Sequence, residues 1–87
     1  MNTLIDTAQM IMNVFAENGV QKHHCLSLFD LFYEKSQWHK CHQDNFNNAL
    51  YELVNQGFIR WGEAYALVLT EEGYNTLSRM DPIIQGH

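Results

Sequence analysis

"NNALYELVNQGFIRWGEAYALVLTEEGYNTL", Asn47–Leu77, decides the fold of this chain, because the spacing of its apolar residues changes twice. Apolar residues first recur at helical spacing up to Gly57, then crowd into the short runs "FIRW" and "YALVLT", and then return to helical spacing. Two apolar runs that flank a glycine-containing loop are typical of a β-hairpin. The stretch therefore predicts a helix, a hairpin and a second helix, in that order.

The helical part of this stretch begins upstream and predicts a helix over 44–56. Its apolar residues follow the i, i+3, i+4, i+7, i+8 pattern of one buried face: Phe46, Ala49, Leu50, Leu53 and Val54. Gly57 supplies a left-handed stop. After the hairpin, Thr70 is placed to cap a last helix, which has two glutamates in its first turn and is expected to end near Met80.

Two further helices are predicted before this stretch. The first covers 3–18, where apolar residues share one face, and the second covers 25–35 after a short extended segment. The second helix is apolar on most sides, so it is expected to be central and to bury Phe29 and Phe32. The segment "WHKCHQ", 38–43, is expected to be a turn.

The length of 87 residues permits one hydrophobic core, so we expect a single domain over 1–80 with a flexible C-terminal tail over 81–87. No apolar run is long enough for a membrane span, and "MNTLIDTAQM" does not resemble an export signal. These features predict a soluble, cytoplasmic protein with no membrane partner. In that compartment Cys25 and Cys41 are expected to stay reduced.

Six potential metal ligands flank the second predicted helix: His23, His24, Cys25, His39, Cys41 and His42. Zinc needs four ligands that converge in a tetrahedron, whereas a helix of this length separates the two groups by about 18 Å. Surface histidines are therefore expected, and no metal. The chain also lacks a glycine-rich phosphate loop, a nucleophile motif and a paired-acid arrangement, so neither an enzyme nor a cofactor is expected.

The order helix, extended segment, helix, turn, helix, hairpin, helix resembles a winged helix-turn-helix domain. "LVNQGFIRW" is similar to the end of that family's recognition helix and the first wing strand. "YALVLTEEGYNTL" resembles the second wing strand and the closing helix, with the Leu-Thr-x-x-Gly turn of marR-like and padR-like regulators. The resemblance extends from Thr3 to Met80. It implies a mainly α fold with a small β-hairpin, in which a three-helix core carries a wing and a C-terminal helix.

The same resemblance implies a transcriptional regulator that binds double-stranded DNA, in a form compatible with a homodimer. Helix 25–35 would support helix 44–56, whose early residues would meet base edges in the major groove. Asparagine amides suit adenine edges, and the other polar and aromatic side chains would contact phosphates. The implied DNA-binding residues are Lys35, Trp38, His39, Lys40, Gln43, Asn45, Asn47, Asn48, Tyr51 and Arg60.

The charge of the chain points to a different class of partner. Ten acids stand against five bases, which gives a formal net charge of −5. Two acids lie on the predicted recognition helix and Glu63 lies at the wing, where phosphate contacts would require cations. The alternative is an acidic winged-helix protein–protein interaction module, an adaptor or inhibitor, that binds through aromatic side chains such as Trp38, Tyr51 or Trp61. Both functions stay open on the sequence.

Overall fold

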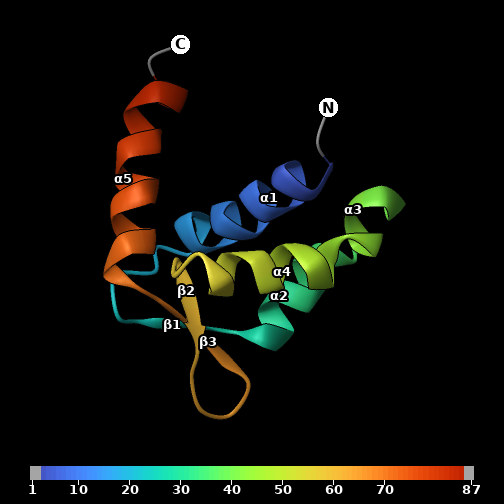
Figure 1. Ribbon diagram of the computed structural model, residues 1–87, viewed down its shortest axis with the longest axis horizontal. Helices are drawn as coiled ribbons and strands as arrows, with labels where there is room; N and C mark the ends of the chain where they lie inside the picture. Colours follow the sequence, from blue (N-terminus) through green and yellow to red (C-terminus); the bar gives the residue numbers. More distant parts are fainter. Residues whose placement is uncertain (1–2, 86–87) are drawn as a thin grey trace.

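The computed structural model describes residues 3–85, and side chains are described for 3–78. The elements are α1 (Thr3–Glu17), β1 (Cys25–Ser27), α2 (Leu28–Lys35), α3 (Lys40–Asp44), α4 (Phe46–Asn55), β2 (Ile59–Trp61), β3 (Ala66–Leu69) and α5 (Glu71–Gln85). The strands form an antiparallel sheet in the order β1-β3-β2. In Figure 1, α1 and α4 lie side by side, the β2–β3 hairpin projects below them and α5 extends upward. The prediction of a mainly helical domain with a small hairpin is confirmed.

The core lies between α1, α4 and one face of the sheet. Its most deeply buried large side chains are Ile11, Phe15, Leu31, Phe46, Ile59, Leu67 and Leu69. Burial of each such side chain contributes about 1.5–3 kcal/mol. The stripe predicted for α4 is confirmed, because its apolar residues are buried apart from Val54, which is half-buried.

Glycine stops and a threonine cap set the predicted boundaries. Gly19 and Gly57 have φ of 66° and 84°, the left-handed region in which glycine avoids the Cβ clash. The Thr70 Oγ1 accepts a hydrogen bond of 3.0 Å from the backbone N–H of Gly73 and so caps α5. A Cβ at Gly73 would overlap the carbonyl of Phe58, so glycine also permits α5 to pack closely on the start of the hairpin.

The predicted second helix is wrong in its first three residues. Cys25–Ser27 form β1, which pairs with β3, and α2 begins at Leu28. The Ser27 Oγ accepts a 3.2 Å hydrogen bond from the Phe29 N–H, so this serine caps α2 and ends the extended segment. Strand β3 also has a second edge whose backbone groups need partners, and β1 supplies them. Helical periodicity over so short an apolar run does not distinguish these states.

The turn predicted over 38–43 contains a short helix, α3, and α4 begins at Phe46 rather than at Asp44. Asn45 separates the two helices with φ −95° and ψ 3°. Its side-chain amide donates a 2.9 Å hydrogen bond to the carbonyl of Cys41, which occupies an acceptor at the end of α3. Asparagine at this junction therefore has a structural role.

The C-terminal helix is longer than predicted. α5 continues past Met80 to Gln85, so the part of the predicted tail over 81–85 is helical. Residues 86–87 lie outside the described part of the chain.

Candidate functional site

Part of the apolar surface of α2 is uncovered. Leu31 is its buried residue, whereas Phe29 and Phe32 expose 63% and 42% of their surface. The prediction that these two phenylalanines belong to the core is therefore wrong. A helix of two turns packs on the body through one side, and no other element in the described part of the chain covers its remaining faces. Exposed apolar side chains that form a contiguous patch are typical of contact surfaces.

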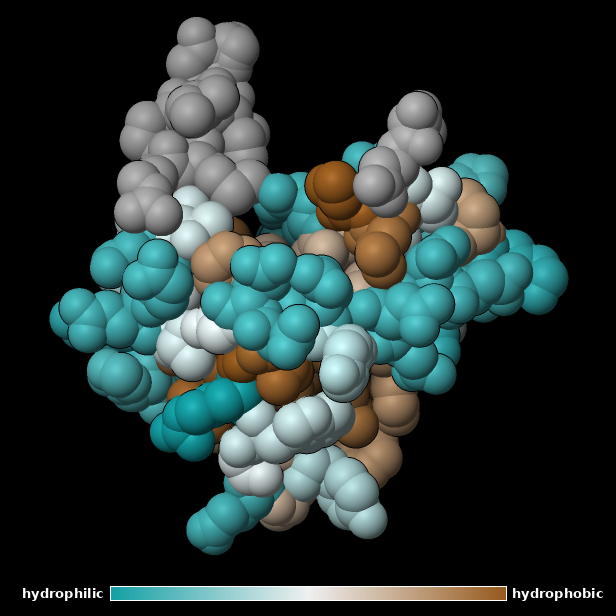
Figure 2. All heavy atoms as spheres, in the orientation of Figure 1, coloured by the Kyte–Doolittle hydropathy of each residue, from teal (hydrophilic) through white to brown (hydrophobic). Residues whose placement is uncertain are grey.

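A groove lies between α2 and α4 and reaches the hairpin; we call it the α2–α4 groove. It is lined by Leu28, Phe32, Phe46, Asn47, Leu50, Tyr51, Val54 and Trp61. Its volume is about 530 Å³, and these lining residues are aliphatic or aromatic apart from Asn47. Tyr51 and Trp61 expose 71% and 51% of their surface into solvent at its walls. Figure 2 shows brown and pale residues gathered below the hydrophilic band of α4, over the hairpin and the neighbouring part of α2.

Contacts between aromatic rings run from the hairpin, through α2, to α4. The centroid of Tyr65 lies 5.9 Å from that of Phe29, and Phe29 lies 6.5 Å from Phe32, both in edge-on geometry. Phe32 in turn lies 5.8 Å from Phe46, which is buried at the base of the groove. Such pairs contribute about 0.5–1.5 kcal/mol beyond burial, so they fix the rings as one aromatic surface.

The hairpin tip is fastened to the start of α2. Ala64 and Tyr65 have φ of 53° and 61°, the signs of a type I′ turn, although neither is the glycine or asparagine that such a turn favours. Left-handed conformations cost about 1–2 kcal/mol for each such residue. In return, the Tyr65 carbonyl accepts a 2.9 Å hydrogen bond from the Leu28 N–H, and its ring meets Phe29. The hairpin tip is thus held against the start of α2.

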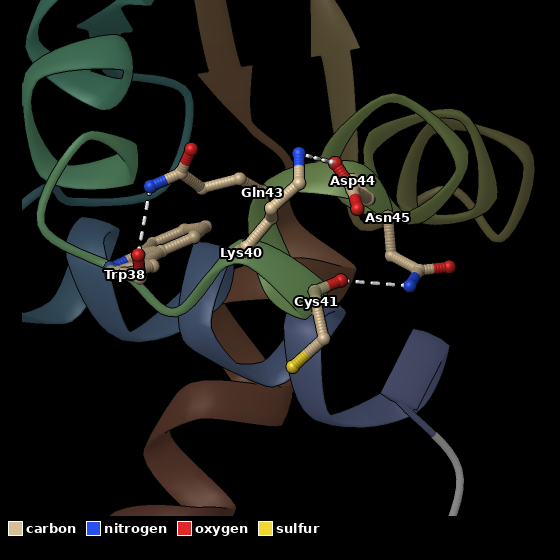
Figure 3. A network of polar contacts seen from close by, with 6 residues as sticks. All are labelled: Trp38, Lys40, Cys41, Gln43, Asp44 and Asn45. Atoms are coloured by element: carbon tan, nitrogen blue, oxygen red, sulfur yellow. Dashed lines mark hydrogen bonds and ion pairs between the residues drawn. The ribbon is translucent and has the colours of Figure 1, made fainter.

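Several residues implied as DNA contacts form hydrogen bonds or an ion pair with neighbouring residues around α3. The amide of Gln43 donates a 2.8 Å hydrogen bond to the Trp38 carbonyl, and Lys40 pairs with Asp44 at 3.3 Å (Figure 3). Asn45 bonds back to the preceding helix, as described above. The two amides therefore each use a donor within the fold, and the charge of Lys40 has an acid beside it.

The other residues that were implied as DNA contacts on the helices lie in different places. Lys35 ends α2 with its Nζ 4.8 Å from the Phe46 ring centroid. Asn47 lines the groove, and Asn48 is exposed beside it on α4. His39 is exposed at the N-terminal boundary of α3, where its side chain makes no capping hydrogen bond. The structure thus places the Lys35 ammonium, at the end of α2, beside Phe46, the first residue of α4.

Arg60 lies away from this surface. The β2–β3 register pairs Arg60 with Val68 and Trp61 with Leu67. Successive side chains of a strand point to opposite faces, and Leu67 belongs to the core face. Trp61 therefore faces the groove, whereas Arg60 lies on the outer face of the sheet.

The two histidine and cysteine groups do not form a metal site. Within the described residues, no group of three or more His, Cys, Asp or Glu side chains is arranged to hold a metal ion. The His42 Nδ1 lies 2.9 Å from the hydroxyl of Thr7, a fully buried residue of α1 that also donates to the Thr3 carbonyl. His42 therefore joins α3 to α1. Cys25 and Cys41 are free, exposed thiols.

The sequence interpretation missed much of the groove lining, notably Leu28, Phe32 and Val54. A signal for it was present in "LFDLFYEK", 28–35, because a helix of two turns carries more apolar surface than one packed face can bury. An excess of apolar residues on a short helix indicates either a central helix or an interface. The structure assigns this helix to the periphery of the core.

Comparison of the chain with protein-family models, with curated proteins and with solved structures found no match. No helix within residues 3–85 is long and apolar enough to cross a membrane. The function is therefore inferred from the chemistry of the surface that α2, α4 and the hairpin form.

Proposed function

We propose that this chain is a winged-helix protein-interaction module that binds an amphipathic helix of a partner protein in the α2–α4 groove. The proposal assigns it no catalytic activity. The observation that supports it is the continuous aromatic surface around the groove, in which Phe32, Tyr51 and Trp61 are all more than 40% exposed.

Binding of a partner that covers an exposed aromatic groove of this kind is strongly favourable, because it removes aromatic surface from water. Aromatic residues are enriched at the centres of protein interfaces, where a few of them carry most of the binding energy. The groove volume of about 530 Å³ suits a small number of large side chains. Single exposed apolar residues are ordinary on protein surfaces, but these are contiguous and surround a concave site.

A helix is the ligand that fits the walls of this groove. All lining residues except Trp61 come from helices α2 and α4, whose interior backbone groups are already bonded within each helix. The groove therefore offers side chains rather than backbone partners, and a ligand that covers it must satisfy its own backbone. From Phe46 to Val54 the α4 wall is about 12 Å long, which matches the reach of i, i+4 and i+7 anchors on a partner helix.

DNA binding is the second candidate, and the exposed Asn47 and Asn48 in the first turn of α4 favour it. The positions of the three basic residues implied as DNA contacts favour DNA binding less. Lys35 lies over aromatic rings, Lys40 is beside Asp44, and Arg60 is on the outer face of the sheet. Phosphate contacts supply most of the affinity of nucleic-acid binders, so this distribution supports a protein partner better.

The proposal is tested with designed helical peptides and with a random-sequence DNA duplex pool. The peptides are about 18 residues long, with Leu, Phe or Trp at i, i+4 and i+7 and alanine or glutamine elsewhere. Both termini are capped so that the peptides are neutral. We expect saturable fluorescence anisotropy changes with dissociation constants of about 1–100 µM for the best peptides. We expect no binding of the duplex pool at comparable protein concentrations in low salt.

Matched scrambled peptides, in which the apolar residues no longer share a face, are the control and are expected to bind at least about tenfold more weakly. Duplex binding tighter than peptide binding would make DNA the partner and would overturn the proposal. Sedimentation of the chain alone tests whether a second copy of the chain occupies the groove. A dimer that Trp61→Ala dissociates would assign the groove to a second copy of this chain instead.

A further inference from the structure

Beside the α2–α4 groove lies Lys35, a cation that forms no ion pair with any of the described side chains. The Lys35 Nζ lies 4.8 Å from the Phe46 ring centroid and 5.6 Å from that of Phe32, and both rings line the groove. Cation–π contacts of this kind hold the ammonium at the apolar wall rather than in free solvent. The ion pair found among the described side chains joins Lys40 to Asp44, so the charge of Lys35 is not neutralised there.

A second depression begins where Lys35 stands. It has a volume of about 270 Å³ and is lined by Phe32, Lys35, Ser36 and Gln43. Phe32 lines both concavities, so the two meet at its side chain.

The polar atoms of this depression favour an acceptor with a negative charge. Gln43 uses one amide hydrogen on the Trp38 carbonyl, and an amide NH₂ has a second to donate. The hydroxyl of Ser36 donates its hydrogen to the Tyr33 carbonyl at 2.6 Å. Within the lining of this depression, the ammonium of Lys35 and one N–H of Gln43 are thus left to donate, and both suit a carboxylate acceptor.

We propose that Lys35 and Gln43 form a carboxylate-binding subsite that fixes the direction of the partner helix in the groove. This inference rests on the proposed function, since it assigns the chemistry at one end of the same ligand. A ligand that covers Phe32 and Phe46 also removes water from the Lys35 ammonium, and a desolvated charge is costly unless it is paired. An Asp or Glu side chain, or a free C-terminal carboxylate, at that end of the partner helix supplies the pair.

The test uses the best neutral panel peptide and versions that carry one glutamate at either the first or the last position, with both termini capped. A further version carries a free C-terminal carboxylate in place of the terminal amide. On the unmodified chain, glutamate at one end, and not at the other, is expected to strengthen binding about tenfold over glutamine. The free-acid version distinguishes a terminal carboxylate from a side-chain carboxylate.

Lys35→Met is the decisive variant, because methionine keeps an apolar stem over the rings and removes the charge. The glutamate preference is expected to fall to about onefold in Lys35→Met, while the neutral peptide binds about as well as before. Lys40→Met is the matched control and is expected to keep the preference. Equal binding of glutamate and glutamine versions, or a preference that survives in Lys35→Met, would overturn the subsite and leave the groove intact. Failure of every peptide, neutral ones included, would overturn both proposals.

Discussion

A Leu50→Asp variant is expected to lack cooperative thermal unfolding and to show the circular dichroism of an unfolded chain. Leu50 is 7% exposed and belongs to the core cluster on α4, the helix that packs against α1. A carboxylate at that position is buried without a partner, which costs several kcal/mol. Small domains have about 5–15 kcal/mol of total stability, so the loss is comparable to the whole.

Asn48→Asp is the matched control for this variant. It introduces the same charge in the same helix, but at an exposed position. Its free energy of unfolding is expected to stay within about 0.5 kcal/mol of that of the unmodified chain, since surface substitutions away from caps and networks are nearly neutral. A Leu50→Asp chain that melts like the control would contradict the assignment of this α4 face to the core.

The second large effect concerns binding. Tyr51→Ala and Trp61→Ala are each expected to weaken the best panel peptide by about 2 kcal/mol, which is about 30-fold in the dissociation constant. Both rings line the groove and are more than half exposed, so their removal deletes contact surface and leaves the core intact. Anisotropy titrations measure the loss, and thermal melts of the same samples establish that the variants are folded.

Tyr33→Ala provides the comparison that separates the groove from general surface stickiness. Tyr33 is 68% exposed on α2, close to the 71% of Tyr51, but it does not line the groove. Its substitution is expected to change the dissociation constant by less than about twofold. Equal losses in Tyr33→Ala and Tyr51→Ala would show that the peptide binds without using the groove.

The sequence predicts those parts of the fold that depend on local signals. Gly19 and Gly57 end α1 and α4 because a left-handed residue there needs no tertiary support. The apolar stripe of α4 and the Thr70 cap of α5 are likewise contained within a few neighbouring residues. The β2–β3 hairpin follows from two apolar runs on either side of a short loop.

The elements that the sequence does not predict depend on distant partners. Cys25–Ser27 become a strand because β3, some forty residues away in the chain, offers a free edge at Val68, Leu67 and Ala66. Periodicity within the segment carries no information about that edge. The α3 helix is similarly held by bonds made only once the chain has folded, among them the contact of His42 with Thr7 on α1.

The sequence predicts only part of the candidate site, because it does not show which apolar residues the fold leaves exposed. Asn47 and Tyr51 share the predicted helix 44–56 and both line the groove, whereas the approach of Lys35 to Phe46 is a contact between two helices that periodicity does not predict. Phe29 and Phe32 were expected in the core because apolar residues are usually buried. Whether a second layer covers such residues is a property of the whole fold, and here the described chain supplies no element that does so.

The most direct test of the central claim, that the α2–α4 groove binds a partner helix, is an amide chemical-shift map of the isotope-labelled chain saturated with the best neutral panel peptide. The largest shifts are expected on residues of α2, α4 and β2 that surround the groove, with α1 changed little. Shifts concentrated on α1 with the groove unchanged, or no saturable change at any residue, would contradict this claim.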